Sequence, residues 1–225
     1  MFLDSTLILL IPVFIFALYA QNKVRSTYRR YLEVPSGRGL SGAQAARQLL
    51  DAAGLRDVGI ETVDGELTDH YDPRKRALFL SRSNYQGSSV SALGVACHEA
   101  GHALQHARGY KPLEIRQAIW PVAGFGSNLA FPLFFIGFLF SVPALMDIGI
   151  AAYAVAAFFA LVTLPVEFDA SKRAVRLLSR HGIVTTQEQG QVKKVLDAAA
   201  LTYVAGALMA VVHLVRLLIL RGSRD

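Results

Sequence analysis

Four long apolar stretches alternate with polar segments along the chain. Each carries little or no charge, and they cover residues 7–20, 117–146, 148–166 and 198–220. Because a helix that crosses a bilayer needs about 20 apolar residues, the pattern predicts a membrane protein with about four transmembrane helices. The first stretch reaches that length only if its helix starts near Phe2.

The stretches differ in how clearly they predict membrane spans. A signal peptide would start with basic residues, but residues 1–4 contain none and a basic cluster follows the first stretch instead, so we predict an uncleaved anchor. The second and third stretches are predicted to form a helical hairpin that turns around Ser141-Val142-Pro143. The fourth contains His213 and Arg216, and a re-entrant or surface helix is its alternative.

Residues 21–116 have the size and pattern of one small soluble domain. Ser41 caps a predicted helix that has an apolar stripe and ends at Gly54. Three runs bounded by turn residues predict the strands 58–63, 66–71 and 77–81. We predict a small antiparallel sheet that leads directly into the next helix, with its strands joined by the turns Asp64-Gly65 and Asp72-Pro73-Arg74.

The next predicted helix covers residues 90–107, with Ser88 or Ser89 as its cap, and it carries His98-Glu99-Ala100-Gly101-His102. Two histidines four residues apart lie one turn apart on one face of a helix and can hold a single Zn²⁺. The glutamate between them is placed to take a proton from a metal-activated water. An amphipathic helix with solvated histidines is the less specific interpretation.

A catalytic zinc site needs a third protein ligand and one open position. His106 lies about 12 Å along a straight helix from His98 and therefore cannot share a metal with it. Glu167 opens a predicted helix that runs to about Arg180, and it would complete a His₂Glu set. Asp169 would point away from Glu167 on that helix, so only one of the two can face the metal, and we favour Glu167.

The predicted sheet is a candidate surface for an extended peptide. Zinc proteases commonly hold a substrate against an edge strand, and residues 77–81 are the candidate edge here. His70 and Tyr71 are candidates for substrate contact or for donating hydrogen bonds to a developing oxyanion. Ordinary side chains at a strand end are the alternative interpretation of both.

Composition and charge agree with a membrane protein. The chain is 53% hydrophobic, with a mean hydropathy of +0.37 and a net charge of +6 that suits contact with anionic lipid. No basic stripe accompanies a recognised nucleic-acid-binding pattern, so we expect no nucleic-acid partner. The single Cys97 excludes an internal disulfide and fits a reducing compartment.

The distribution of basic residues predicts the orientation in the membrane. Of the 23 Lys and Arg residues, 14 lie between Lys23 and Arg116 and six between Lys172 and Lys194, while the hairpin turn has none. Both polar segments are therefore predicted to face the cytoplasm. This orientation places all three candidate metal ligands on one side of the membrane.

The chain resembles the YugP-type membrane neutral zinc metallopeptidases of bacteria. The resemblance covers nearly the whole chain, and it rests on Gly39-Leu40-Ser41-Gly42-Ala43, Asp69-His70-Tyr71-Asp72-Pro73, Cys97-His98-Glu99-Ala100-Gly101-His102-Ala103-Leu104-Gln105-His106 and Leu164-Pro165-Val166-Glu167-Phe168-Asp169-Ala170-Ser171. The resemblance implies peptidase activity but does not identify a substrate.

The chain is more distantly similar to membrane proteases of the prenyl-protein and heat-shock type. This similarity implies that His98, His102 and Glu167 are ligands and that Glu99 is the base. In that group an aspartate four residues after the ligand glutamate supports a ligand histidine. Ser171 stands there in this chain, so we expect Asp169 or another carboxylate to provide the support.

We therefore expect a mainly α membrane protein with about four transmembrane helices and a small cytoplasmic zincin-like α+β catalytic domain. The expected division is a transmembrane anchor (1–21), the zincin-like domain (22–116), a transmembrane hairpin (117–166), a cytoplasmic helical segment with the third ligand (167–199) and a transmembrane or membrane-associated helix (200–225).

The expected function is that of a gluzincin-like endopeptidase with one Zn²⁺ per chain, in the bacterial inner (plasma) membrane, with its active site facing the cytoplasm. Peptides or membrane proteins are the expected substrates, and a homo-oligomer or a regulatory membrane partner is left open. One alternative is a non-catalytic zinc-binding membrane scaffold or chaperone, against which the presence of Glu99 argues. An intramembrane protease and a transporter are disfavoured, because the motif helix is polar and the hairpin spans lack ionisable groups.

Overall fold

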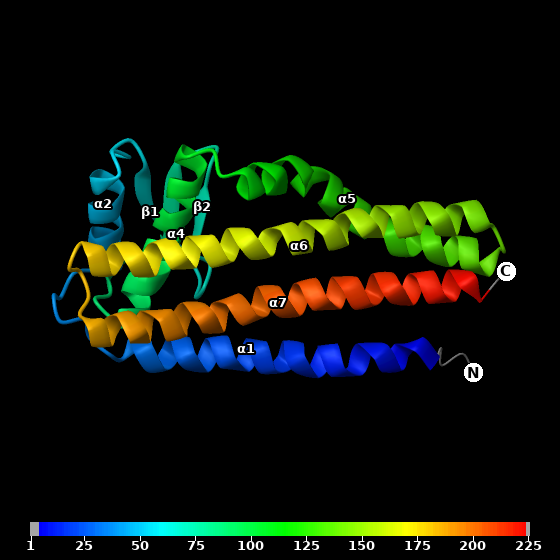
Figure 1. Cartoon of the computed structure of the whole chain (residues 1–225), viewed down its shortest axis with the longest axis horizontal. Coiled ribbons are helices and arrows are strands. Elements are labelled where there is room, and N and C mark those ends of the chain that lie inside the picture. The colour runs from blue at the N-terminus through cyan, green and yellow to red at the C-terminus, as the bar shows by residue number, and fades with distance from the viewer. Residues whose placement is uncertain (1–4, 224–225) are drawn as a thin grey trace. The chain divides into compact units, whose positions relative to one another are not determined.

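The computed structural model describes residues 5–223, and most of them are helical (Figure 1). A short 3₁₀ helix covers Ser5–Leu9. The helices are α1 (Leu10–Leu32), α2 (Gly42–Ala52), α3 (Arg82–Gln86), α4 (Val90–Ala107), α5 (Lys111–Leu139), α6 (Pro143–Arg180) and α7 (Thr186–Gly222). The strands are β1 (Gly59–Val63), β2 (His70–Asp72) and β3 (Ala77–Ser81).

The described chain divides into two compact units, which we call the helical unit and the α+β unit. Among the described residues, the helical unit consists of 5–21, 114–165 and 202–223. The α+β unit consists of 22–113 and 166–201. Helices α1, α5, α6 and α7 each pass from one unit into the other.

The helices that carry the four apolar stretches are long and apolar enough to cross a membrane, which confirms four candidate spans. They cover Ser5–Leu32, Lys111–Leu139, Pro143–Arg180 and Thr186–Gly222. The predicted hairpin turn is also confirmed, because α5 ends at Leu139 and α6 begins at Pro143. In the fourth span, the Arg216 side chain donates a hydrogen bond to Thr6 Oγ1 (3.1 Å), which gives its charge a polar partner within the helical unit.

Helix α6 differs from the sequence-based prediction in where it begins. We predicted that a separate helix opens at Glu167, but α6 runs without a break from Pro143 to Arg180. Pro165 lies inside it, two residues before Glu167. Proline is tolerated inside helices of membrane proteins because neighbouring groups satisfy the freed backbone carbonyl.

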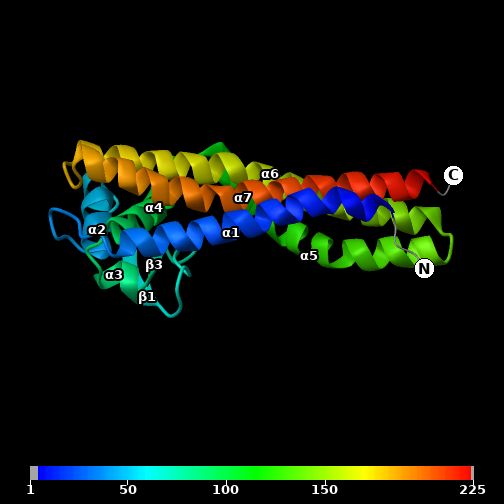
Figure 2. The same cartoon turned by 90° about the horizontal axis from the view of Figure 1, so that it is seen from below.

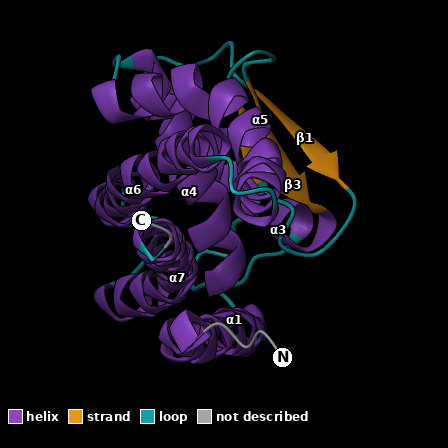
Figure 3. Cartoon of the chain, turned by 90° about the vertical axis from the view of Figure 1, so that its right-hand side faces the viewer, coloured by secondary structure: helices purple, strands orange, loops and turns teal. Residues whose placement is uncertain are grey.

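The sheet is mixed rather than antiparallel, with the strand order β1-β3-β2. Figures 2 and 3 label two of its strands, β1 and β3. Strand β1 pairs with β3 in parallel, from Gly59 opposite Ala77 to Val63 opposite Ser81. The predicted hairpin at Asp64-Gly65 is therefore wrong, whereas the predicted hairpin between the last two strands is confirmed, since β2 pairs antiparallel with β3.

Strand β3 is the central strand, so the predicted edge strand at 77–81 is also wrong. Four of its five residues are buried on the two faces of the sheet. A central strand needs this burial on both faces, and its apolar sequence was compatible with that place. Helix α3 also lies between β3 and α4, so the sheet does not lead directly into the motif helix.

Helix α4 is the centre of the α+β unit, and helix α2 packs against it. Ser41 caps α2, as its sequence predicted, and the structure adds a capping box with Gln44. Gly54 follows the helix with a φ of +79°. Two faces of α4 are covered by apolar clusters. One cluster contains Leu50, Leu78, Leu80, Ala96 and Ala100, and the other contains Leu49, Leu93, Cys97, Leu178 and Val192. The α4 backbone is thus held against the sheet, α2, α6 and α7.

Candidate metal centre

Helix α4 begins and ends close to the predicted positions. Ser89 is its N-cap, and the Ser89 side chain accepts a hydrogen bond from the Ala92 backbone N–H (3.1 Å). The helix is uninterrupted to Ala107, so His98 and His102 project from successive turns on one face. Glu99 and His102 are buried, and His98 is partly buried.

Gly101 lets α6 approach α4 closely at this point. A Cβ atom at residue 101 would lie 2.7 Å from the Ala170 backbone oxygen, which is far inside normal contact distance. Glu167 lies three residues before Ala170, about one turn along α6. The close approach at Gly101 thus brings the Glu167 side chain against the two histidines.

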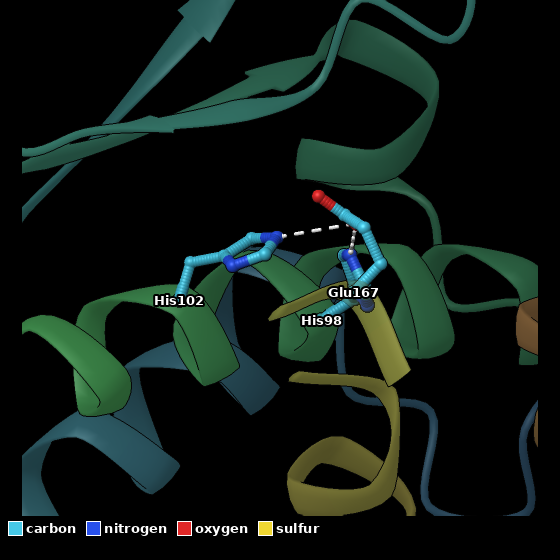
Figure 4. A group of neighbouring side chains, drawn as sticks. All are labelled: His98, His102 and Glu167. Atoms are coloured by element: carbon cyan, nitrogen blue, oxygen red, sulfur yellow. Dashed lines mark hydrogen bonds and ion pairs between the residues drawn. The ribbon is translucent and has the colours of Figure 1, made fainter. Parts of the chain in front are cut away.

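Three side chains converge in the α+β unit, as Figure 4 shows. Glu167 Oε2 lies 3.2 Å from His98 Nε2 and 3.5 Å from His102 Nε2. The imidazole rings are 4.7 Å apart between centroids and nearly perpendicular to each other. One potential ligand atom from each residue lies within 4.8 Å of the other two, so the group could hold one metal ion.

A chain of hydrogen bonds supports His102 from behind. His102 Nδ1 lies 3.0 Å from Gln105 Oε1, while Gln105 Nε2 donates to the Val166 backbone oxygen and to Asp169 Oδ2, both at 2.8 Å. Because Gln105 Nε2 faces two acceptors, Gln105 Oε1 must be the acceptor for His102 Nδ1–H. In the neutral form of the ring, which is the form that binds a metal, His102 Nε2 is then the unprotonated nitrogen, and it faces Glu167 Oε2.

Ser171 supports His98 in the same manner. Ser171 Oγ lies 3.1 Å from His98 Nδ1, on the opposite side of the ring from Glu167. The serine therefore occupies the place where the distantly similar proteases have an aspartate. Asp169 supports the other histidine, and does so through Gln105 rather than directly.

Burial and the close carboxylates shift the pKa values of the site. Burial opposes ionisation of Glu167, but hydrogen bonds from both histidines hold its pKa well below the ordinary value. Burial disfavours the charged form of His102, yet the contact with Glu167 dominates and raises the pKa of that ring. Burial raises the pKa of Glu99, and this outweighs the opposing effect of the two histidines.

The donor set fits a catalytic zinc ion. Two neutral imidazoles and one carboxylate form a known catalytic combination, and here both imidazoles direct Nε2 to the same carboxylate oxygen while Nδ1 is held elsewhere. Histidine ligands of zinc typically have such partners on the second ring nitrogen. The single Cys97 is buried in the apolar cluster with Leu49 and Leu93, and it is not part of this group of potential ligands.

The other candidate residues have different partners. His106 Nδ1 is 2.8 Å from the Tyr71 hydroxyl, in agreement with its exclusion as a ligand. The His70 ring stacks on Phe79 with centroids 5.0 Å apart. Asp169 accepts a hydrogen bond from Arg173 as well as from Gln105. The oxyanion role of His70 and Tyr71 stays a prediction.

Sequence reasoning missed Gln105 as the partner of His102. The two residues are three positions apart on one helix, a spacing at which side chains meet, so the sequence contained a usable signal. The link from Gln105 to Asp169 was not visible in this way, because it joins α4 to α6 across 64 positions.

Comparisons with known proteins agree on one family. Residues 6–222 match the sequence profile of a family described as "Putative neutral zinc metallopeptidase". The chain is also 47% identical over 208 residues to the "Putative membrane protease YugP" of Bacillus subtilis (strain 168), and the matched region covers 92% of each chain. No solved structure matches the chain.

Proposed function

Because this chain belongs to the neutral zinc metallopeptidase family, we propose that it is a membrane-bound zinc endopeptidase of the gluzincin type. His98, His102 and Glu167 hold one Zn²⁺ in this proposal. The observation that carries it is the convergence of both Nε2 atoms on Glu167 Oε2, at 3.2 and 3.5 Å. The fourth position on the metal is left for water and substrate.

Glu99 is the general base of the proposed reaction. When bound, Zn²⁺ lowers the pKa of a water and polarises the scissile carbonyl. The Glu99 carboxylate accepts the proton of the attacking water and then delivers it to the leaving amine. Its place next to His98 on α4 and its burial, which it shares with His102, support a position beside the metal. Its burial, which favours the protonated form, helps it to carry that proton between the two steps.

Gln105 and Asp169 position His102 in this proposal, and Gln105→Leu tests that role. Leucine keeps much of the side-chain volume but leaves His102 Nδ1 without its acceptor. We expect zinc affinity to fall by about 10- to 100-fold, measured by competition with a chelator of known affinity. Gln187→Leu makes the same change at an exposed glutamine on α7, so it should keep the wild-type zinc affinity. Equal affinities of the wild type and Gln105→Leu would contradict the positioning role.

We further propose that the site works at the cytoplasmic surface of the bacterial plasma membrane on membrane-associated substrates. Glu167 directly follows the apolar stretch 148–166, so the third ligand lies where the uncharged part of α6 ends. The basic residues of both polar segments support the cytoplasmic orientation.

A matched pair of substrates tests this substrate class. The same cleavable peptide is offered to the intact enzyme in proteoliposomes, once attached to a transmembrane helix and once free in solution. We expect the anchored peptide to be cleaved at least about tenfold faster, because anchoring raises its effective concentration at the membrane surface. Equal rates at equal total concentration would contradict a preference for membrane-associated substrates.

A further inference from the structure

A groove with a volume of about 520 Å³ lies between the parts of α6 and α7 that belong to the α+β unit. These two helix segments run side by side, as the yellow and orange ribbons of Figures 1 and 2 show. Its volume lies in the range of pockets that bind small molecules. Ser171 lines the groove as well as contacting His98, so the groove reaches the back of the candidate metal centre.

One wall of the groove carries a row of cations. Lys172, Arg176 and Arg180 follow each other at four-residue spacing on α6, and all three are exposed. None of them forms an ion pair with a carboxylate among residues 5–223. Like charges at this spacing destabilise a helix, so the row is an unfavourable arrangement that a bound anion would relieve.

The opposite wall adds little negative charge. Lys193 and Asp197 line it and form an ion pair with each other. Four cations and one carboxylate therefore face the groove. Arginine and lysine at such a site suit a phosphate group, to which arginine can donate two parallel hydrogen bonds.

One end of the groove is apolar, and along the chain it is the end nearest the apolar stretches 148–166 and 198–220. Phe168 and Ala200 line this end. Phe168 follows the apolar stretch 148–166 by two residues, and Ala200 lies within the stretch 198–220. The Phe168 side chain is 39% exposed, although it is large and apolar. Phosphate alone would not use this surface, whereas a molecule with both a phosphate and an acyl chain would.

The groove is not placed as the substrate cleft. Ser171 contacts His98 through Nδ1, whereas the metal ligand atom Nε2 points to Glu167. An occupant of the groove thus lies behind the ligand histidine, away from the reacting carbonyl. A peptide substrate is therefore a weaker candidate than a ligand that stays bound during turnover.

We propose that this groove binds one anionic phospholipid, with the headgroup phosphate on Lys172 and Arg176 and an acyl chain against Phe168 and Ala200. The charge of the wall selects anionic over zwitterionic headgroups, and the apolar end selects a lipid over free phosphate. The bound lipid links α6 and α7 next to the apolar stretches 148–166 and 198–220.

Native mass spectrometry of the full chain in detergent tests the proposal without reference to peptidase activity. The protein is offered phosphatidylglycerol and phosphatidylcholine with identical acyl chains. We expect the wild type to retain one phosphatidylglycerol, with a preference over phosphatidylcholine of at least about tenfold, as several basic residues near one headgroup imply. Lys172→Gln/Arg176→Gln should reduce this preference to within about twofold.

Arg56→Gln/Arg74→Gln is the matched control, because it removes two exposed cations outside the groove. It should keep the wild-type preference, and circular dichroism should show equal helix content in all three proteins. No lipid preference in the wild type, or an equal loss in the control, would overturn the proposal. Displacement of phosphatidylglycerol by millimolar inorganic phosphate would reduce the groove to a phosphate site, and retention of a poly-glutamate peptide in place of lipid would make it a peptide site.

Discussion

Replacing Glu99 by glutamine is expected to abolish peptide hydrolysis while zinc stays bound. Glu99 is the proposed base and not a ligand, and a general base contributes about 10²- to 10⁴-fold to the rate. Glutamine has nearly the same shape, and burial already favours the neutral form of the Glu99 carboxyl, so the substitution should preserve the fold. Zinc content by elemental analysis and kcat on a quenched-fluorescence peptide check both parts.

Glu61→Gln is the matched control for this experiment. Glu61 is exposed on β1, so the same chemical change there should leave both zinc content and kcat at wild-type levels. Undiminished hydrolysis by Glu99→Gln would show that another group takes the proton. Loss of zinc together with activity would instead make Glu99 part of the metal-binding set.

Replacing Glu167 by alanine is expected to lower zinc affinity by more than about 100-fold. The substitution removes the only anionic ligand of the proposed set, so its effect should exceed the 10- to 100-fold typical of supporting residues. It also leaves both histidines without the carboxylate that they share. Chelator competition measures the affinity, and hydrolysis should be lost in parallel.

Asp169→Asn provides the comparison that separates the two carboxylates on α6. Asp169 contacts Gln105 and Arg173, so its substitution should lower zinc affinity only about 10- to 100-fold, as for other supporting residues. The order of the two effects decides between the ligand candidates that the sequence left open. A larger loss for Asp169→Asn than for Glu167→Ala would reverse the assignment.

Local sequence signals predicted the elements that position the site. Ser89 and the uninterrupted run to Ala107 predicted α4, and Ser41 with Gly54 predicted α2. These signals act within a few residues, through side-chain hydrogen bonds to the backbone and through backbone conformation. The spacing of His98 and His102 likewise follows from helix geometry alone.

Contacts between distant segments were harder to predict. The Asp64-Gly65 pair is a strong local turn signal, but β1 pairs in parallel with β3, and nothing near residue 64 specifies that pairing. The predicted helix start at Glu167 is also wrong, because α6 runs without a break through Pro165. Gly101 could not be explained from its local sequence either, because a larger side chain there is excluded by the backbone of α6.

Some of the groups that support the two histidines could be predicted from local spacing, whereas others depend on contacts between distant segments. Gln105 is local to His102 and could have been recognised from its spacing. Ser171 and Asp169 lie on α6, and their pairing with α4 depends on how the two helices approach each other. The sequence therefore predicted the candidate ligands, whereas their orientation required the structure.

Zinc-dependent hydrolysis by the purified full chain tests the central claim most directly. The wild type is assayed on a membrane-anchored peptide as isolated, after metal removal with a chelator, and after one equivalent of Zn²⁺ is returned. The account predicts one zinc per chain, loss of cleavage with the metal and recovery with its return, with Glu99→Gln inactive at each step. Cleavage that persists without metal, or zinc that binds stoichiometrically without any cleavage of anchored peptides, would contradict it, and the second result would favour a zinc-binding scaffold.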